Sequence, residues 1–235
     1  MISILTLIPA RSGSKGIPDK NIKLLNGKPL IQYSIDQAKK SKYTEQMRII
    51  VSTDSENYAS IAKKLGAECS FLRPTEISQD LSTDYQFIEH ALNYLKKKEN
   101  YIPDIILQLR PTQPLRRVED IDKCLDIFIQ KRNNYDSLRS VTKFEKSPYK
   151  MYSIEGENLI PLFKEINGIK EPYNECRQHL PDTYIHTGYI DIFNSKIVRK
   201  GTISGDRVYP YVLENTGIVD IDTMYDWEKS EKLLS

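Results

Sequence analysis

The chain has 235 residues, 39% of them hydrophobic and 28% charged, and its formal net charge is +2. These values are typical of a single soluble globular domain, which at this length forms a core without disulfides. The near-neutral charge argues against a dedicated nucleic-acid binder, because the affinity of such a protein depends on neutralising phosphates.

The cysteines and the N-terminus indicate a reducing compartment. Cys69, Cys124 and Cys176 are widely spaced and form no C-x-x-C pair, so neither a zinc site nor a disulfide framework is indicated. The first residues lack the basic segment of a signal peptide, and no apolar run is long enough to span a bilayer. We therefore expect a cytoplasmic protein without a membrane partner.

The first part of the chain alternates strands and helices. Residues 2–8 form a β-branched, apolar run that predicts a buried strand, and residues 48–52 predict a second one. Between them a helical pattern begins at Pro29, and proline is favoured at helix starts. Ser55 is expected to cap a helix over 56–65.

The same alternation continues through the middle of the chain. Apolar spacing predicts helices over 83–97 and 118–131, separated by a strand over 104–109. Strands that alternate with helices indicate βαβ units and a mostly parallel sheet. We therefore predict a doubly wound α/β fold, in which ligands bind at the carboxyl ends of the strands.

The pattern breaks after about residue 143. Residues 144–185 are rich in Pro, Tyr, Glu and Asn and lack clear periodicity, so we interpret them as an excursion from the sheet, with hairpins that meet a second subunit. Regular order returns at 187–193, and a last helix is predicted over 223–234. We predict one domain over 1–235, with an inserted segment at about 144–185 whose hairpins serve dimerisation, and hence a homodimer.

A loop rich in Gly, Ser and Lys follows the first strand, over residues 8–21 (IPARSGSKGIPDKN). Gly13 and Gly16 are expected to allow close backbone approach and positive φ, and successive backbone N–H groups in such a loop form an anion-binding nest. These features suit a triphosphate, although a solvated surface loop is the alternative interpretation. The loop also carries three cations, which are Arg11, Lys15 and Lys20.

This loop closely resembles the phosphate loop of the CMP-sialic acid synthetases, also called acylneuraminate cytidylyltransferases. The resemblance implies a nucleotide-diphospho-sugar transferase-like fold and a loop that wraps the phosphates of CTP. Residues 71–76 (FLRPTE) resemble the family segment whose arginine contacts the cytosine. By this resemblance the nucleotide-binding residues are Ala10, Arg11, Ser14, Lys15, Asn21 and Arg73.

A second motif departs from the family pattern. Residues 109–116 (LRPTQPLR) resemble the family's L-Q-P-T-S-P-L-R at the end of a central strand. Arg110 stands where the family has a glutamine that contacts the sugar, and Gln113 replaces a serine. Arginine is always charged and offers a fork of donors, so we predict that Arg110 grips a carboxylate or a phosphate of the acceptor. A structural ion pair is the alternative, and the departure leaves the acceptor sugar open.

Two segments of the excursion, 147–151 and 174–181, resemble family segments that supply cations to the carboxylate of the sugar acid. Thr187 stands where the family has an asparagine that contacts the sugar, and we assign it to the acceptor site. We interpret His179 and His186 as residues without a catalytic role, because nothing in the sequence pairs either with a nucleophile. The other predicted substrate-binding residues are Lys150, Arg177 and Gln178.

Two acids stand near the end of the chain. In an extended segment the side chains at i and i+2 share one face, so Asp220 and Asp222 present two carboxylates together. A divalent cation relieves the repulsion between them, and magnesium prefers a few carboxylates with phosphate oxygens. The resemblance implies that this pair binds Mg²⁺ at the phosphates. The alternative is that Asp222 caps the last helix; Asp54 is a weaker candidate that helix capping explains equally well.

The resemblance as a whole implies an enzyme that transfers CMP from CTP to the anomeric hydroxyl of a sialic or related nonulosonic acid and releases pyrophosphate, with Mg²⁺ as cofactor. Such a transfer needs charge neutralisation and in-line positioning. Two alternatives stay open: the same chemistry on a different nucleotide and sugar pair, and a non-enzymatic nucleotide-sensing module. The residues to which we assign catalytic roles are Arg11, Lys20 and Asp222.

Overall fold

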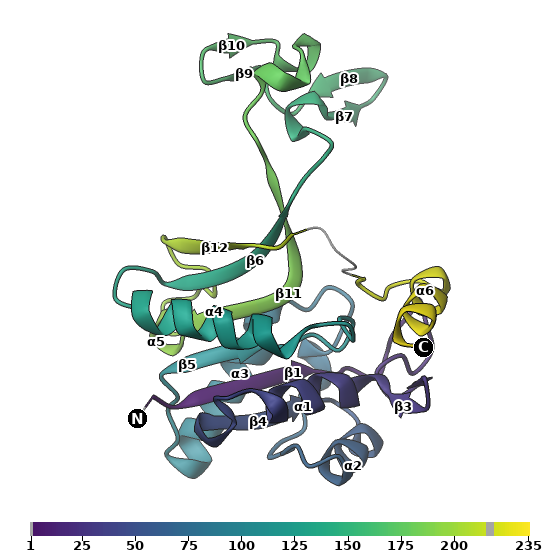
Figure 1. Ribbon diagram of the computed structural model, residues 1–235, viewed down its shortest axis with the longest axis vertical. Coiled ribbons are helices and arrows are strands. Elements are labelled where there is room, and N and C mark those ends of the chain that lie inside the picture. The colour runs from purple at the N-terminus through teal and green to yellow at the C-terminus, as the bar shows by residue number, and fades with distance from the viewer. Residues whose placement is uncertain (1, 215–218) are drawn as a thin grey trace.

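The computed structural model describes residues 2–214 and 219–235 of the chain (Figure 1). Its centre is a six-stranded sheet with the strand order β12-β6-β11-β5-β1-β4. The strands are β1 (Ile4–Pro9), β4 (Met47–Ser52), β5 (Ile105–Gln108), β6 (Ser137–Lys143), β11 (Tyr184–Asn194) and β12 (Val208–Val212).

The sheet is mostly parallel, as predicted. Strand β1 runs parallel to β4 and to β5, and β12 runs parallel to β6. Only β11 is antiparallel to its neighbours β5 and β6. The chain leaves the sheet from the end of β6 and returns directly into β11, so this strand has to run in the opposite direction to β6.

The helices lie close to the predicted ranges. Ser55 caps α2 as expected, because its hydroxyl accepts a hydrogen bond from the Tyr58 N–H at 3.4 Å. The short helix α5 was not predicted. The helices are α1 (Leu30–Lys40), α2 (Glu56–Lys64), α3 (Asp84–Glu99), α4 (Val118–Lys131), α5 (Ser195–Val198) and α6 (Met224–Leu234).

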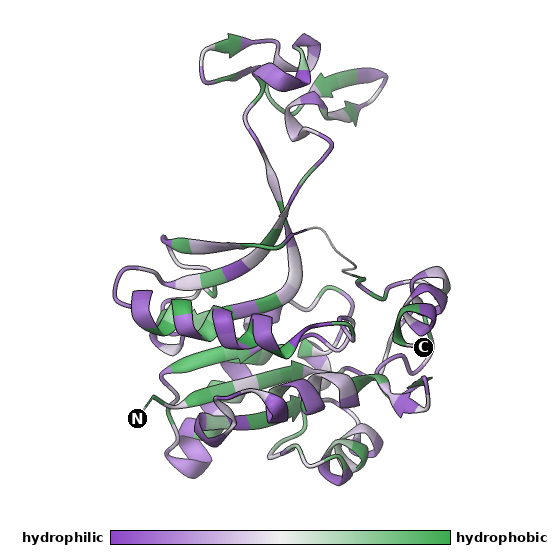
Figure 2. Cartoon of the chain, in the orientation of Figure 1, coloured by the Kyte–Doolittle hydropathy of each residue, from purple (hydrophilic) through white to green (hydrophobic). Residues whose placement is uncertain are grey.

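Helices cover both faces of the sheet, which confirms the doubly wound architecture (Figure 1). Side chains of β1 alternate between two cores: Ile4 and Ile8 pack with α1, α2 and α4, whereas Leu5 and Leu7 pack with α3 and α5. Figure 2 shows the hydrophobic strands between helices whose outer faces are hydrophilic. Burial of the sheet on both faces therefore explains why its central strands read as continuous apolar runs.

A third, smaller core joins the two ends of the chain. Ile17 of the loop after β1 is fully buried with Ile221 and Trp227 of the C-terminal segment. The short ribbon of β2 (Leu24–Leu25) and β3 (Lys28–Pro29) contributes Leu25 to the same cluster. Apolar packing thus holds the C-terminal segment against the glycine-rich loop.

The predicted excursion projects from the sheet as an arm on two extended segments (Figure 1). It carries the hairpin β7 (Tyr152–Glu155) and β8 (Asn158–Pro161), and the ribbon β9 (Glu165–Ile166) and β10 (Ile169–Lys170). Several large apolar side chains on it are exposed, and Figure 2 shows hydrophobic stretches at the tip of the arm. No helix among the residues that the structure describes is long and apolar enough to cross a membrane.

Candidate active site

A cleft of about 410 Å³ opens at the carboxyl ends of β1 and β5. Its walls are the loop after β1, the residues before and at the start of α3, the loop after β5, and Asp222. This is the edge of the sheet at which doubly wound folds bind ligands. Of the predicted nucleotide-binding residues, those that line the cleft are Arg11, Ser14, Lys15, Asn21 and Arg73.

Hydrogen bonds to neighbouring elements hold the loop after β1 in shape. Asp54, which follows β4, accepts the backbone N–H and the hydroxyl of Ser12, both at 2.8 Å. The buried Asn21 donates to the Arg11 carbonyl at 3.0 Å, and the Ala10 N–H donates to the Ser52 carbonyl at 2.9 Å. Ala10 is fully buried and therefore supports the loop through its backbone.

The glycines of this loop act differently from the prediction. The expectation of positive φ is wrong at both Gly13 and Gly16, because neither is among the left-handed residues of the chain. Close approach is confirmed at Gly16, where a Cβ atom would lie only 2.5 Å from the carbonyl oxygen of Asp222. Any side chain at Gly16 would push the two segments apart, whereas Gly13 has open space around it.

The loop and the C-terminal acids lie together. The Lys20 ammonium is 2.6 Å from the Ile221 carbonyl oxygen and 3.1 Å from a carboxylate oxygen of Asp222. Its side chain is only 13% exposed, whereas that of Asp222 is 74% exposed and lines the cleft. A cation from residue 20 and a carboxylate from residue 222 therefore share one end of the cleft.

The helix-capping alternative for Asp222 is wrong, because Thr223 caps α6 in a capping box with Asp226. The carboxylate of Asp222 is thus left facing the cleft. Asp220 sits beside the loop after β5, where Thr112 hydrogen-bonds to it. Partial desolvation and the nearby charge of Asp222 raise the pKa of Asp220, and the Thr112 hydrogen bond only partly offsets them.

A carboxylate from the segment before α3 forms ion pairs with the cations of the loop. Asp80 accepts a charged hydrogen bond from Arg11 at 2.7 Å through one oxygen and pairs with Lys15 through the other. Hydrogen bonds from Lys15 and Arg11 lower the pKa of Asp80, so it is ionised near neutral pH. A negative charge therefore already lies where the loop concentrates its cations.

Arg73, unlike the cations of the loop, is buried. It is 6% exposed, and its guanidinium donates to the carbonyl oxygen of Ser52 at 2.6 Å and lies 4.8 Å from the ring centroid of Phe87. Desolvation lowers the pKa of Arg73 to about 10, so it stays charged at neutral pH. Both residues line the cleft, and because the guanidinium lies over the buried Phe87 ring, it is Arg73 that presents a planar cation there.

Arg110 also lines the cleft, but two acids hold it. One Nη atom is 2.7 Å from Asp191 and the other is 2.5 Å from Asp84, the first residue of α3. Gly188 has a φ of +63°, and a Cβ atom there would lie 2.6 Å from Arg110. The structural ion pair considered from the sequence is therefore present, and it leaves Arg110 charge-compensated at the edge of the cleft.

Asp191 is the centre of this charge network. It is fully buried on β11, and it also accepts a hydrogen bond from His186 at 2.7 Å and pairs with Arg139 at 3.0 Å. Burial alone would raise the pKa of Asp191, but the His186 hydrogen bond and the charges of Arg139 and Arg110 outweigh it and lower the pKa to about 2.

The predicted acceptor residues do not gather in one place within the chain. Thr187 lies at the bulge of β11, where its hydroxyl donates to the Ser140 carbonyl and its own carbonyl accepts from Gln113. The 3₁₀ turns that contain Lys150, Arg177 and Gln178 are on the arm, which Figure 1 shows well away from the strand ends that form the cleft. Arg177 pairs there with Glu145 at 2.5 Å.

Four site residues were missed or undervalued from the sequence: Asp54, Asp80, Asp84 and Asp191. Asp54 follows a predicted strand, a position at which ligand-site residues concentrate in this fold class, so it carried a usable signal. The other three owe their role to cations that lie 26 to 81 residues away in the chain, as in the Arg110 pairs. Residues near these acids in the sequence give no indication of such distant partners.

Comparison with known proteins agrees with this geometry. The family model described as cytidylyltransferase matches residues 5–155, which is more than half of the chain. The chain belongs to the cytidylyltransferase family. The match spans the glycine-rich loop after β1, the cations that line the cleft and the first part of the arm.

Curated relatives of the cytidylyltransferase chain are named for a set of related sugar acids. It is 35% identical to the CMP-N,N'-diacetyllegionaminic acid synthase of Legionella pneumophila, over 98% of this chain and 96% of that protein. It is 32% identical to the pseudaminic acid cytidylyltransferase of Campylobacter jejuni, over 95% and 93% of the two chains. The N-acylneuraminate cytidylyltransferase of Escherichia coli O18:K1:H7 is 31% identical over 96% of this chain. The chain spans about half the length of that relative.

Solved structures support the fold. The CMP:2-keto-3-deoxy-manno-octonic acid synthetase complexed with CTP superposes with a TM-score of 0.67 at 16% identity, over 99% of this chain and 98% of that one. The 4-diphosphocytidyl-2C-methyl-D-erythritol synthase of Anaerococcus prevotii gives 0.62 at 12% identity, over 99% and 98%. At these identities the likeness establishes that the cytidylyltransferase chain has a nucleotidyltransferase fold.

Proposed function

We propose that this chain transfers CMP from CTP to the anomeric hydroxyl of a sialic or related nonulosonic acid and releases pyrophosphate. The observation that carries the proposal is the junction of the glycine-rich loop with the C-terminal acids, through Lys20 and through the Gly16 contact with Asp222. Cytidylyltransferase relatives named for sialic, legionaminic and pseudaminic acids point to the same class of acceptor.

The cleft suits nucleotidyl transfer through positioning and charge. Backbone N–H groups of the loop, with Arg11 and Lys15, bind the triphosphate, and Lys20 stabilises the charge that grows on the departing pyrophosphate. Arg73, which is held over the Phe87 ring, provides the planar cation that receives the cytosine. The acceptor hydroxyl then attacks the α-phosphorus in line with the pyrophosphate leaving group, while Asp222 accepts the hydroxyl proton.

The two acids fit a magnesium ion. Among the described residues no cluster of three or more His, Cys, Asp and Glu side chains is arranged to hold a metal, so Asp220 and Asp222 need phosphate oxygens to complete a site. Magnesium accepts such sites, which combine one or two carboxylates with substrate phosphates and water. A bound Mg²⁺ would supply charge neutralisation at the phosphates. The raised pKa of Asp220 beside Asp222 agrees with a site that favours a cation.

The charge network at Arg110 leaves no free cation there for a sugar phosphate. Both Nη groups of Arg110 already pair with Asp84 and Asp191, so no uncompensated cation faces the cleft at this position. The different nucleotide and sugar pair considered above therefore gains no support from Arg110.

We propose that the protein is a homodimer whose arms complete the acceptor sites. Lys150, Arg177 and Gln178 lie on the arm, so they reach a bound sugar only if the arm of one chain covers the cleft of another. The arm also exposes large apolar side chains, among them Ile154 with 78% and Leu159 with 61% of the residue surface exposed. Exposed apolar surface of this kind is typical of a protein–protein interface.

Charges on the arm are expected to separate the dimer. The double variant Ile154→Glu with Leu159→Glu places two like charges on the paired strands β7 and β8, where Ile154 and Leu159 face each other in register. Light scattering should then report the mass of one chain instead of two. Leu233→Glu, on the exposed side of α6, is the matched control and should keep the dimer mass. A wild-type monomer would contradict the proposal.

Removing the charge of Asp80 is expected to tighten CTP binding. Asp80 competes with the triphosphate for Arg11 and Lys15, so Asp80→Asn should lower the Kd for CTP about two- to fivefold, the scale of exposed ion pairs. Calorimetric titration with CTP and Mg²⁺ measures this. The control is Asp182→Asn, which removes an exposed ion pair with Lys143 on the arm base. A weaker affinity in Asp80→Asn would show that Asp80 helps to bind the nucleotide.

Nucleotide choice separates the proposal from its alternatives. Thermal shifts with CTP, GTP and ATP, each with Mg²⁺, should show selective stabilisation by CTP, because ligand that binds only the folded state raises Tm. Stronger stabilisation by a purine nucleotide would favour the different nucleotide and sugar pair. Tight CTP binding without turnover of any nonulosonic acid would favour a nucleotide sensor.

A further inference from the structure

A second cavity lies at the opposite end of the sheet from the cleft. It has a volume of about 330 Å³ and is formed where β5 begins, where β11 ends and where α4 ends. Helix α5 forms one wall, and Figure 1 shows this helix at the same end of the sheet as the N-terminus. The nucleotidyltransferase chemistry proposed above uses no residue of this cavity.

The cavity has an excess of unpaired positive charge. Arg132, Lys196 and Arg199 line it, and none of these three side chains has a hydrogen bond or an ion pair with another residue that the structure describes. Its acid, Asp104, is already engaged, since it accepts the Ser3 backbone N–H at 2.9 Å and the Ser3 hydroxyl at 3.4 Å. In the nucleotide cleft, by contrast, carboxylates already pair with the loop cations.

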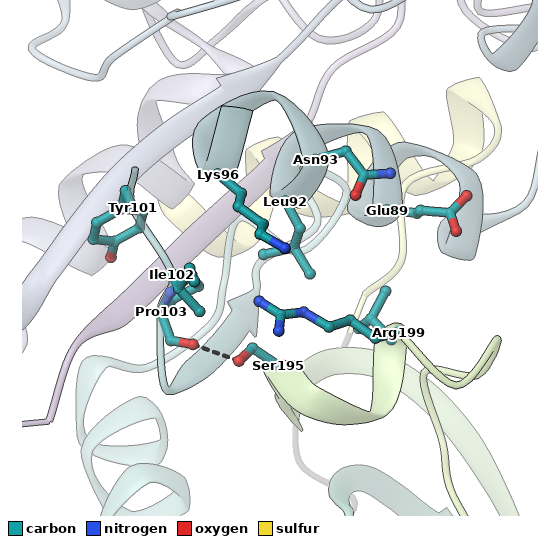
Figure 3. A pocket seen from close by; sticks show the side chains of 10 residues that line it. Glu89, Leu92, Asn93, Lys96, Tyr101, Ile102, Pro103, Ser195 and Arg199 are labelled. Carbon is teal, nitrogen blue, oxygen red and sulfur yellow. Dashed lines mark hydrogen bonds between the residues drawn. The ribbon is translucent and has the colours of Figure 1, made fainter. Parts of the chain in front are cut away.

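The backbone that carries these cations is firmly tied together. Asn194 donates through its side chain to the Arg132 carbonyl at 3.1 Å, which joins the end of β11 to the end of α4. The Ser195 N–H donates to the Asp104 carbonyl at 3.1 Å, and its hydroxyl donates to the Pro103 carbonyl (Figure 3). These bonds hold the segments around the cavity in fixed relative positions, so a ligand meets a preformed wall.

A small recess of mixed polarity adjoins the cavity. The two share Ile102, Pro103, Ser195 and Arg199, and α3 adds Leu92 together with the polar side chains of Glu89, Asn93 and Lys96. In Figure 3 the Arg199 side chain extends beneath α3, and the Lys96 ammonium lies on the same side of the recess. The site therefore combines cations with apolar side chains, among them Leu92, Ile102 and Val198, and pockets for organic anions combine these two kinds of lining.

We propose that this rear cavity binds a small phosphate monoester whose organic part is the size of a sugar or a nucleoside. Three cations and one acid give the lining a net charge of +2, which matches the near-dianion that a phosphate monoester forms at pH 7. Arginine and lysine are the side chains that bind phosphate through charged hydrogen bonds. The volume exceeds that of a phosphate ion and leaves room for the attached group.

Protection of Lys196 from chemical modification tests this site directly. The wild-type protein is treated with a lysine-acetylating reagent, and mass spectrometry follows the rate at each lysine with AMP, inorganic phosphate or sodium chloride at matched ionic strength. AMP is expected to slow modification of Lys196 at least about threefold, while exposed Lys64 on α2, remote in sequence and unpaired, serves as the control and stays unchanged. Equal slowing by sodium chloride, or slowing by inorganic phosphate alone, would overturn the proposal.

Two substitutions sharpen the result. In Arg132→Gln with Arg199→Gln, the AMP concentration that half-protects Lys196 should rise at least about tenfold, because two charged hydrogen bonds to the phosphate are lost. Lys64→Gln is the matched control and should leave that concentration unchanged. An unchanged concentration in the double variant contradicts the proposal. Since the readout is local to Lys196 and needs no turnover, it succeeds or fails independently of cytidylyl transfer.

Discussion

Replacing Lys20 with methionine is expected to lower kcat about a hundredfold to a thousandfold, the usual effect of removing one charged group that stabilises a transition state. The ammonium of Lys20 sits between the glycine-rich loop and Asp222, with only 13% of the side chain exposed. Methionine keeps most of the side-chain volume, so the loss isolates the charge. Steady-state rates of pyrophosphate release with CTP and an acceptor give the measurement.

The control for Lys20 lies three residues further along the chain. Lys23 is exposed and does not line the cleft, although its ammonium lies 5.6 Å from the ring centroid of Trp227. Lys23→Met should therefore keep kcat within about twofold of the wild type, as surface substitutions usually do. If Lys20→Met raised only the KM for CTP and left kcat unchanged, Lys20 would bind the ground state and the transition state equally.

Asp191→Asn is expected to lower the free energy of unfolding by about 3–5 kcal/mol, the cost of leaving a buried charge without its partner. Arg110 would keep only Asp84, and Arg139 would lose its carboxylate partner among the described residues. Urea denaturation followed by circular dichroism measures the change. The control is Asp182→Asn, which removes an exposed pair with Lys143 and should leave the unfolding midpoint unchanged. Equal stability of both variants would show that Asp191 does not organise this region.

Because of Asp191, the free energy of unfolding is also expected to depend on pH in the acid range. The folded-state pKa of Asp191 is about 2, below the value of about 3.9 for an unfolded aspartate. Its contribution is therefore complete above about pH 4 and is lost as the pH falls through the folded-state pKa. Between pH 4 and pH 2 the wild type should lose stability more steeply than Asp191→Asn. Parallel curves for the two proteins would contradict this.

The sheet and helices could be predicted where apolar periodicity is strong. Strand β1 and helices α1 to α4 match their predicted ranges because each buries a continuous apolar run or stripe. Strands β6 and β12 were missed, since SLRSVTK and VYPYV are short and mixed in polarity. They form because each pairs with a neighbour that is distant in the chain, and β6 pairs with both β11 and β12.

Within the site, local motifs were predictable and long-range partners were not. The sequence of the loop indicated an anion site, and the structure places its residues along one cleft. Close approach at Gly16 was predicted, but its partner is the carbonyl of Asp222, which lies 206 residues later and which the sequence could not identify. An ion pair of Arg110 was considered from the sequence, but its two carboxylate partners could not be named because they come from α3 and β11.

A coupled assay for pyrophosphate addresses cytidylyl transfer most directly. The protein is incubated with CTP, Mg²⁺ and, in separate reactions, sialic, legionaminic and pseudaminic acid, the compounds for which its relatives are named. We expect pyrophosphate release with at least one of these acids, and none when GTP replaces CTP. Absence of release with all three acids at saturating CTP and Mg²⁺, from folded protein, would contradict the proposed reaction.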